Sequence, residues 1–185
     1  MRSRFLLIAC LLIMGVCIHC KSSKPVDVFV QNYDTGLSIR EGVWLYKNKR
    51  FTGYRIESDR NGKLLYQLPI INGKEEGEAV GWYNTGEKLL VSHFLNGKKQ
   101  GQFEQWWPNG HTRYLFHYSG GILDGQQCVF YPSGQKRQES NFSMGVEEGI
   151  QRVWNDKGEL VSNYTIKGKK IYGIVSVKSC LPNEH

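Results

Sequence analysis

Short runs rich in aromatic and β-branched residues alternate with polar, glycine-containing stretches over most of this 185-residue chain. Gln102 to Trp107 and His111 to Ser119 are two neighbouring runs, separated by the segment Pro108 to Gly110. Runs of this length and composition predict β-strands, and the stretches between them predict turns. The pattern therefore indicates an all-β protein.

The glycines recur at three fixed phases with a spacing of 24 residues. Gly53 and Gly62 continue the pattern upstream, and Gly168 and Gly173 continue it downstream. Such self-similarity predicts a row of similar units, each of which contacts mainly its neighbours. The phases are seen in Gly73, Gly77 and Gly86; Gly97, Gly101 and Gly110; Gly121, Gly125 and Gly134; and Gly145, Gly149 and Gly158.

The segment Trp107 to Gly110 indicates how each unit turns. Proline at the second position and glycine at the fourth predict a type I turn closed by a left-handed glycine, with a G1 bulge. Tyr83 to Gly86 and Tyr131 to Gly134 occupy the same phase. The other glycine pair of each unit, such as Gly97 and Gly101, turns the chain into the next hairpin. We therefore predict an elongated antiparallel meander of repeated β-hairpins of about 24 residues, in a single sheet.

The repeat units resemble a known family. Asn72 to Gly77 followed by Trp82 to Gly86, and Asn96 to Gly101 followed by Trp106 to Gly110, are similar to MORN-type repeats of the bacterial variant. The segment from Glu41 to Tyr46 with Phe51 to Gly53 resembles the opening of such an array. The resemblance covers roughly residues 36 to 175 and implies a MORN-like sheet. Bacterial chains of this kind are often labelled antitoxin components, and eukaryotic relatives are associated with membrane phospholipids and protein scaffolding.

The first twenty residues have the pattern of an export signal. Arg2 and Arg4 precede an apolar run from Phe5 to Ile18, which is too short to span a hydrocarbon core of ~30 Å as a helix. Cys20, followed by a polar tether, resembles the acceptor cysteine of a bacterial lipoprotein; Cys17, an uncleaved anchor and plain secretion are alternatives. The predicted organisation is a signal peptide (1–20), a tether and lead-in segment (21–35), the repeat array (36–175) and a C-terminal tail (176–185).

Composition and charge narrow the possible partners. The formal net charge is +7, and it falls to +5 without Arg2 and Arg4. This mildly basic balance does not indicate a nucleic-acid-binding protein. Cys128 and Cys180 lie about two hairpins apart, roughly 20 Å. A disulfide tolerates a Cα separation of only about 7 Å, so we expect these two cysteines not to be bonded.

No motif of a hydrolase, zinc protease or P-loop enzyme occurs in the sequence. His93 and His117 occupy the same phase of successive repeats and are expected to lie roughly 10 Å apart, too far to share a metal. We therefore expect a protein that is not an enzyme and that needs no cofactor or metal.

Strand alternation separates two predicted faces of the sheet. An aromatic face is expected to be the core and to carry Trp82, Leu90, Phe94, Trp106, Tyr114, Phe116, Tyr118, Cys128, Phe130, Phe142 and Trp154. A mixed, basic face, which also includes Phe103, is the candidate binding surface because tryptophan, tyrosine and arginine are enriched at interfaces. The candidate binding residues are Tyr83, Trp107, Arg113, His117, Tyr131 and Arg137.

Three classes of function remain. The leading one is a non-enzymatic lipoprotein of the bacterial cell envelope, on its periplasmic or surface side, whose repeat sheet binds an unknown protein or an envelope polymer. The second is a module that binds anionic lipids at a membrane surface, favoured by the positive charge. The third is an antitoxin-like inhibitor of a partner toxin, implied only by the family label.

The first prediction concerns the anchor. Replacing Cys20 with Ser removes the thiol that would carry the lipid, so palmitate labelling and membrane retention of the full chain should both be lost. Labelling and cell fractionation measure the two effects. Labelling that persists in the Cys20→Ser variant and disappears on replacing Cys17 would move the acceptor to Cys17.

Overall fold

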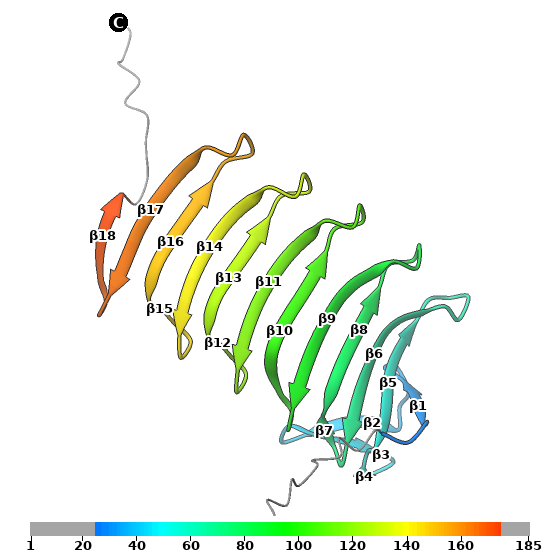
Figure 1. The fold of residues 1–185 in the computed structure, drawn as a ribbon. Coiled ribbons are helices and arrows are strands. Elements are labelled where there is room, and N and C mark those ends of the chain that lie inside the picture. Colours follow the sequence, from blue (N-terminus) through cyan, green and yellow to red (C-terminus); the bar gives the residue numbers. More distant parts are fainter. Residues whose placement is uncertain (1–24, 175–185) are drawn as a thin grey trace, which may run out of the picture.

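The structure is a computed structural model that describes residues 25–174 (Figure 1). Eighteen strands lie within these residues; fifteen join one long sheet and three form a small second sheet. In the same range there is no helix that is long and apolar enough to span a membrane. The predicted all-β meander of hairpins is thereby confirmed, whereas the predicted signal peptide, Cys20, Cys180 and the tail lie outside the described residues.

Consecutive strands of the long sheet pair with one another in chain order from β5 onward, all antiparallel. Figure 1 shows the resulting row of hairpins, which stand side by side from β5 to β18. The strands are β5 (Gly53–Ser58), β6 (Leu64–Ile71), β8 (Gly77–Trp82), β9 (Lys88–Leu95), β10 (Lys98–Trp106), β11 (Thr112–Ser119), β13 (Gly125–Phe130), β14 (Lys136–Ser143), β16 (Gly149–Trp154), β17 (Leu160–Lys167) and β18 (Lys170–Ile174).

Short strands complete the sheet. β7 (Lys74–Glu75), β12 (Ile122–Leu123) and β15 (Val146–Glu147) extend the turns that link one hairpin to the next. β1 (Phe29–Gln31) pairs in parallel with β5 at the N-terminal edge. Part of the segment predicted as a tether, 21–35, therefore belongs to the sheet.

The turns within the hairpins have the predicted geometry. The amide of Gly110 donates to the carbonyl of Trp107 at 2.9 Å, and the amide of Trp107 donates to the carbonyl of His111 at 2.8 Å. Gly110 has a φ of +83°, in the left-handed region. The same pair of bonds occurs at Tyr83, Tyr131 and Asn155, so the turn is a constant part of the repeat.

A second glycine of each unit lies directly opposite a large side chain on the neighbouring strand. Gly125, for example, has a φ of +84° and pairs with Phe142. Glycine is favoured at such a position because it accepts a positive φ, whereas a Cβ on Gly125 would meet no atom within 4 Å. The remaining pairs of this kind are Gly53 with Ile70, Gly77 with Phe94, Gly101 with Tyr118 and Gly149 with Ile166.

The second sheet lies outside the row of hairpins, although its residues fall within the predicted repeat array, which began at residue 36. β2 (Leu37–Arg40), β3 (Val43–Tyr46) and β4 (Lys49–Arg50) pair only with one another. Glu41 and Gly42 both have positive φ, 50° and 68°, and close a tight two-residue turn that folds β2 back on β3. We call β2 to β4 with Phe51 the N-terminal cap.

The cap covers one face of the first hairpins and forms the main core. Phe51, Leu68, Ile70 and Ala79 are at most 4% exposed, and Trp44 packs against this cluster. The amide of Trp44 donates to the carbonyl of Gly73 at 2.8 Å, and the amide of Gly73 donates to the carbonyl of Phe51 at 2.7 Å. A Cβ on Gly73 would lie 2.6 Å from Val43 Cγ1, so this close contact requires glycine.

Cross-strand pairs define two faces of the long sheet. The cap face is the face that the cap covers at one end; the charged face is the opposite one. The pairs place Ile70, Phe94, Phe103, Tyr114, Phe116, Tyr118 and Phe142 on the cap face. They place Glu78, His93, Glu104, His117, Glu139 and Arg152 on the charged face.

The predicted division into faces is wrong, and a bulge is the reason. Gln105 pairs with Tyr114, but the next residue, Trp106, pairs with Thr112, which leaves Arg113 as an extra residue. Trp106 and Tyr114 therefore lie on opposite faces. Alternation from the paired residues puts Trp82, Trp106, Cys128, Phe130 and Trp154 on the charged face, and Phe103 joins the cap face.

The second prediction tests whether the cap carries the core. Ile70 and Ile166 both face a glycine across the strand pair, but only Ile70 lies beneath the cap and is fully buried. Ile70→Ala should lower the free energy of unfolding by about 3 kcal/mol. Ile166→Ala, the matched control, should cost roughly 1 kcal/mol because its side chain is only partly buried. Urea denaturation measures both, and equal losses would contradict a core formed by the cap.

Candidate functional site

Four aromatic rings on hairpin β10–β11 form a continuous cluster where the cap face is no longer covered. We call Phe103, Tyr114, Phe116 and Tyr118 the aromatic stripe. The ring centroids of Phe103 and Phe116 are 6.0 Å apart, and those of Tyr114 and Phe116 are 5.2 Å apart. Tyr118 meets Phe103 edge-on at 6.5 Å. These separations are typical of favourable aromatic pairs, and all four rings remain partly exposed.

A cation lies at each end of the aromatic stripe. Lys99 Nζ is 4.9 Å from the ring centre of Phe103 and 5.0 Å from that of Tyr118. The Arg113 guanidinium is 4.3 Å from the ring of Trp107 and 4.9 Å from that of Tyr114. Neither cation forms an ion pair within residues 25–174. Their partners are ring faces, which attract cations through the aromatic quadrupole.

A carboxylate borders this part of the cap face, because Glu147 of β15 pairs with Phe142. Strand register places no carboxylate of β10, β11, β13 or β14 on this face. Burial raises the pKa of the Tyr118 hydroxyl, so this phenol stays neutral throughout the physiological range. On β10, β11, β13 and β14 the cap face therefore carries rings, amides and hydroxyls, with a cation at either end of the stripe.

A groove of about 210 Å³ lies next to the stripe on the cap face. Phe116 and Phe142 flank it, and Gln138 Nε2 donates to Ser140 Oγ at 2.9 Å within it. No hydrogen bond among the described residues uses Gln138 Oε1, so this acceptor is available to a ligand. The complete lining is Phe116, Leu123, Gln127, Val129, Gln138, Ser140 and Phe142.

Gln127 closes the bottom of the groove and has a structural role. Its amide bonds to backbone groups at both ends: Oε1 accepts from the His117 amide at 2.8 Å, and Nε2 donates to the His117 carbonyl at 3.2 Å. Gln151, one repeat further on, donates in the same way to the carbonyl of Asn141. These buried amides satisfy backbone groups that the bulged strands leave unpaired.

Three of the predicted binding residues serve to join hairpins. Tyr83 Oη donates to the carbonyl of Trp106 at 2.7 Å, Trp107 Nε1 to that of Phe130 at 3.2 Å, and Tyr131 Oη to that of Trp154 at 3.0 Å. Each bond spans 23 residues. These side chains are half-buried, and they form a ladder along the turns rather than an exposed surface.

Of the other three predicted binding residues, the two arginines lie over aromatic rings of the predicted set, whereas His117 lies apart from them. Arg113 lies over Trp107, and Arg137 lies 5.8 Å from the ring centre of Tyr131 in the next repeat. His117 is on the charged face, and its Nδ1 is 3.0 Å from the carbonyl oxygen of Gln126. Since a carbonyl only accepts, Nδ1 carries the proton. His93 makes the same contact one repeat earlier, which indicates a structural role.

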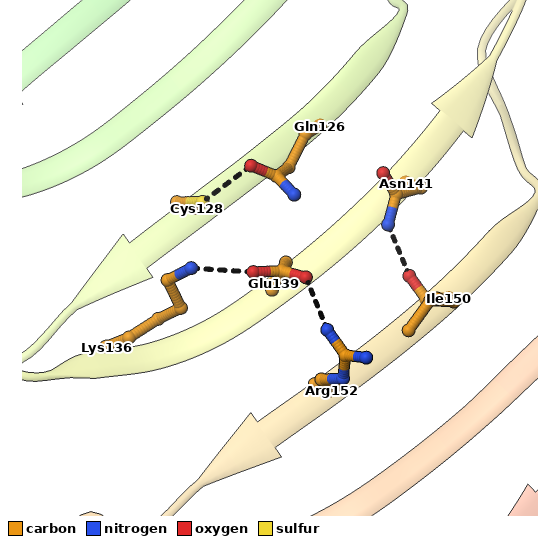
Figure 2. Close-up of polar contacts among 7 residues, drawn as sticks. All are labelled: Gln126, Cys128, Lys136, Glu139, Asn141, Ile150 and Arg152. Carbon is orange, nitrogen blue, oxygen red and sulfur yellow. Dashed lines mark hydrogen bonds and ion pairs between the residues drawn. The ribbon is translucent and has the colours of Figure 1, made fainter.

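The charged face contains a compact ionic cluster, shown in Figure 2. Glu139, only 7% exposed, accepts from Lys136 at 2.6 Å and from Arg152 at 3.1 Å. The hydrogen bond from Lys136 lowers the pKa of Glu139 below its usual value, and Arg152 adds to this effect. Cys128 is buried beside the cluster, and burial raises the pKa of its thiol. A buried cysteine with a raised pKa is unreactive.

Sequence reasoning missed Lys99 and the groove, and it placed Phe103 on the wrong face. The extra residue of the bulge is Arg113 in one repeat and Arg137 in the next, and the register shifts at both. Neither residue type marks a bulge. The cross-strand pairing of Gly101 with Tyr118 and of Gly125 with Phe142 is the regularity that identifies the cap face, and it was present in the glycine spacing.

One repeat of the chain matches the model of a known family. Residues 123–144 match the family model of the MORN repeat variant, and this stretch spans hairpin β13–β14. The match supports the resemblance of the repeats to MORN-type units. No curated protein matches the chain at a significant level. Within residues 25–174, no group of three or more histidine, cysteine, aspartate or glutamate side chains is placed to hold a metal ion.

The third prediction concerns Glu139. Because its pKa is lowered in the folded state, its ion pairs stabilise the protein above the unfolded-state pKa of about 4.3, and this stabilisation is lost as the pH falls through the folded value. Glu139→Gln should lower the free energy of unfolding by about 2 kcal/mol at pH 7. The difference from the unchanged protein should shrink below pH 4.

Urea denaturation at both pH values measures the effect. Glu104→Gln is the matched control, because Glu104 lies on the same face and forms no ion pair among the described residues. A loss that is independent of pH, or equal for the two variants, would contradict the assignment.

Proposed function

We propose that the protein is a non-enzymatic scaffold whose repeat sheet binds another protein or an envelope polymer. The observation that carries this proposal is that the cap covers the cap face only over the first hairpins and leaves the rest of this face open. Its aromatic stripe is partly exposed and free of carboxylates, whereas the equivalent face of the first hairpins is covered by the cap. A partly exposed aromatic surface on a rigid sheet is typical of binding sites.

The roles of the polar side chains support the absence of enzymatic activity. His93 and His117 bond to backbone carbonyls, Glu139 is held between two cations, and Cys128 is buried. A catalytic site needs a nucleophile, a base and an orienting group in mutual contact near a cavity. The aromatic stripe and the groove carry rings, amides and hydroxyls instead.

The proposed location is the bacterial cell envelope, with the chain anchored to a membrane by a lipid on Cys20. The sequence pattern of residues 1–25 supports this location. A short tether then precedes β1, which starts at Phe29. The scaffold would thus be held close to the membrane surface, facing the polymers and proteins of the envelope.

Binding to anionic lipids is a second candidate, because the turns linking the hairpins expose apolar side chains. Met144 is 79% exposed, Val146 61% and Ile122 46%. Exposed apolar side chains at the ends of hairpins are suited to contact with a membrane surface. Glu147 and Glu148 beside them weaken this candidate, since they repel anionic lipids.

The fourth prediction tests the proposed function with a photoreactive phenylalanine analogue placed at single positions of the full chain in its own host. Tyr118 and His117 are neighbours in β11 that point to opposite faces, so they form a matched pair. The probe at position 118 should yield adducts with a macromolecule, and the probe at position 117 should not. Gel mobility and mass spectrometry measure the result.

A third probe at position 144 separates the alternatives. Adducts with phospholipid at 144, and none at 118, would favour lipid binding through the turns. Adducts only at 117 would move the binding surface to the charged face. The absence of adducts at all three positions would contradict a scaffold.

A further inference from the structure

We infer that the open part of the cap face binds a linear, hydroxyl-rich and uncharged glycan that lies across the strands, with one sugar ring in the groove between Phe116 and Phe142. This inference rests on the proposed function and names the class of polymer. It follows from the charge, the hydrogen-bonding groups and the spacing of side chains on this face.

The available hydrogen-bonding groups disfavour a peptide. Within residues 25–174, each long strand from β5 to β17 is paired on both sides, so the middle of the sheet has no open strand edge. Extended peptides usually gain affinity by adding a strand to an open edge. On the cap face, a ligand meets only side chains, and these suit a molecule that itself carries many hydroxyl groups and apolar C–H faces.

The groove has the composition that a sugar ring requires. Phe116 and Phe142 present ring surfaces for the C–H faces of a sugar, and the volume of about 210 Å³ admits a single six-membered ring with its substituents. Gln138 Oε1 is free to accept a hydrogen bond, and the Ser140 hydroxyl, which accepts from Gln138, retains its proton to donate. β10, β11, β13 and β14 place no carboxylate on this face, and Glu147 of β15 lies opposite Phe142 at its edge.

The repeat spacing extends this site along the sheet. Tyr118, Phe142 and Ile166 occupy the same position on three successive hairpins, each opposite a glycine. Two strands per hairpin give an advance of about 10 Å between these residues. This advance is close to that of two rings in an extended glycan, so a linear chain would meet one such side chain for every second sugar.

The geometry therefore predicts that affinity depends on the length of the glycan. The open cap face covers hairpins β10–β11, β13–β14 and β16–β17, roughly 30 Å in all. Six linked rings would span it, whereas three would reach about half of the contacts. Binding should strengthen with length up to about six rings and change little beyond.

The fifth prediction uses the detergent-solubilised full chain and two fluorescently labelled hexamers, cellohexaose and chitohexaose, in polarisation titrations. At least one hexamer should bind, and its trimer should bind about tenfold more weakly. Phe142→Ala should weaken binding of the hexamer about tenfold, the loss of one aromatic contact of 1–1.5 kcal/mol. Phe130→Ala, on the charged face of the same hairpin, should leave affinity within about twofold.

Two further measurements guard against an effect of unfolding. The thermal midpoint of each variant is recorded, and Gln138→Ala, which removes one amide without opening the core, should weaken binding about threefold. An uncharged, end-capped decapeptide serves as the competing class of ligand. Failure of both hexamers to bind, or equal binding by the Phe142→Ala and Phe130→Ala variants, would overturn the glycan assignment. Peptide binding that depends on Phe142 would also overturn it, while leaving the scaffold function in place.

Discussion

The pairing of a left-handed glycine with a large side chain on the neighbouring strand is the constraint on which the rest of the structure depends. It recurs from Gly53 with Ile70 to Gly149 with Ile166. The backbone φ is positive at each of these glycines, so another residue would be strained there. Because the pairing recurs once per hairpin, it sets the period of the array and directs one large side chain per repeat to the same face.

The hairpins could be predicted from the sequence, because glycine phase and turn residues are local properties. The faces could not, because one extra residue at Arg113 reverses the alternation between Trp106 and Tyr114. The cap could not be predicted from the sequence pattern either. Trp44 and Phe51 resemble the repeat units in composition, and their packing on Leu68 and Ile70 depends on contacts between distant segments. Local sequence features thus predict the hairpins, whereas contacts between distant segments determine which of their side chains form the core.

The two faces differ in how far their side chains are used to hold the structure together. On the charged face and along the turns, polar side chains are used to join strands, as with Tyr131 and the cluster around Glu139. On the open cap face, Gln138 Oε1 remains without a partner in the described residues, and the aromatic stripe is only partly covered. A candidate site is therefore recognised less by its residue types, which occur on both faces, than by what the surrounding structure leaves unused.

The position of the cap also makes the array asymmetric in its dynamics. Each hairpin is supported only by its neighbours, and at one end the cap adds a tertiary core. At the other end, β18 is exposed along its whole length and, among the described strands, pairs with β17 alone. Local opening consequently costs least at β18 and most near β6, so fluctuations should spread from the C-terminal hairpin toward the capped end. The molecule behaves as a strip fixed at one end, with a gradient of protection against hydrogen exchange along its length.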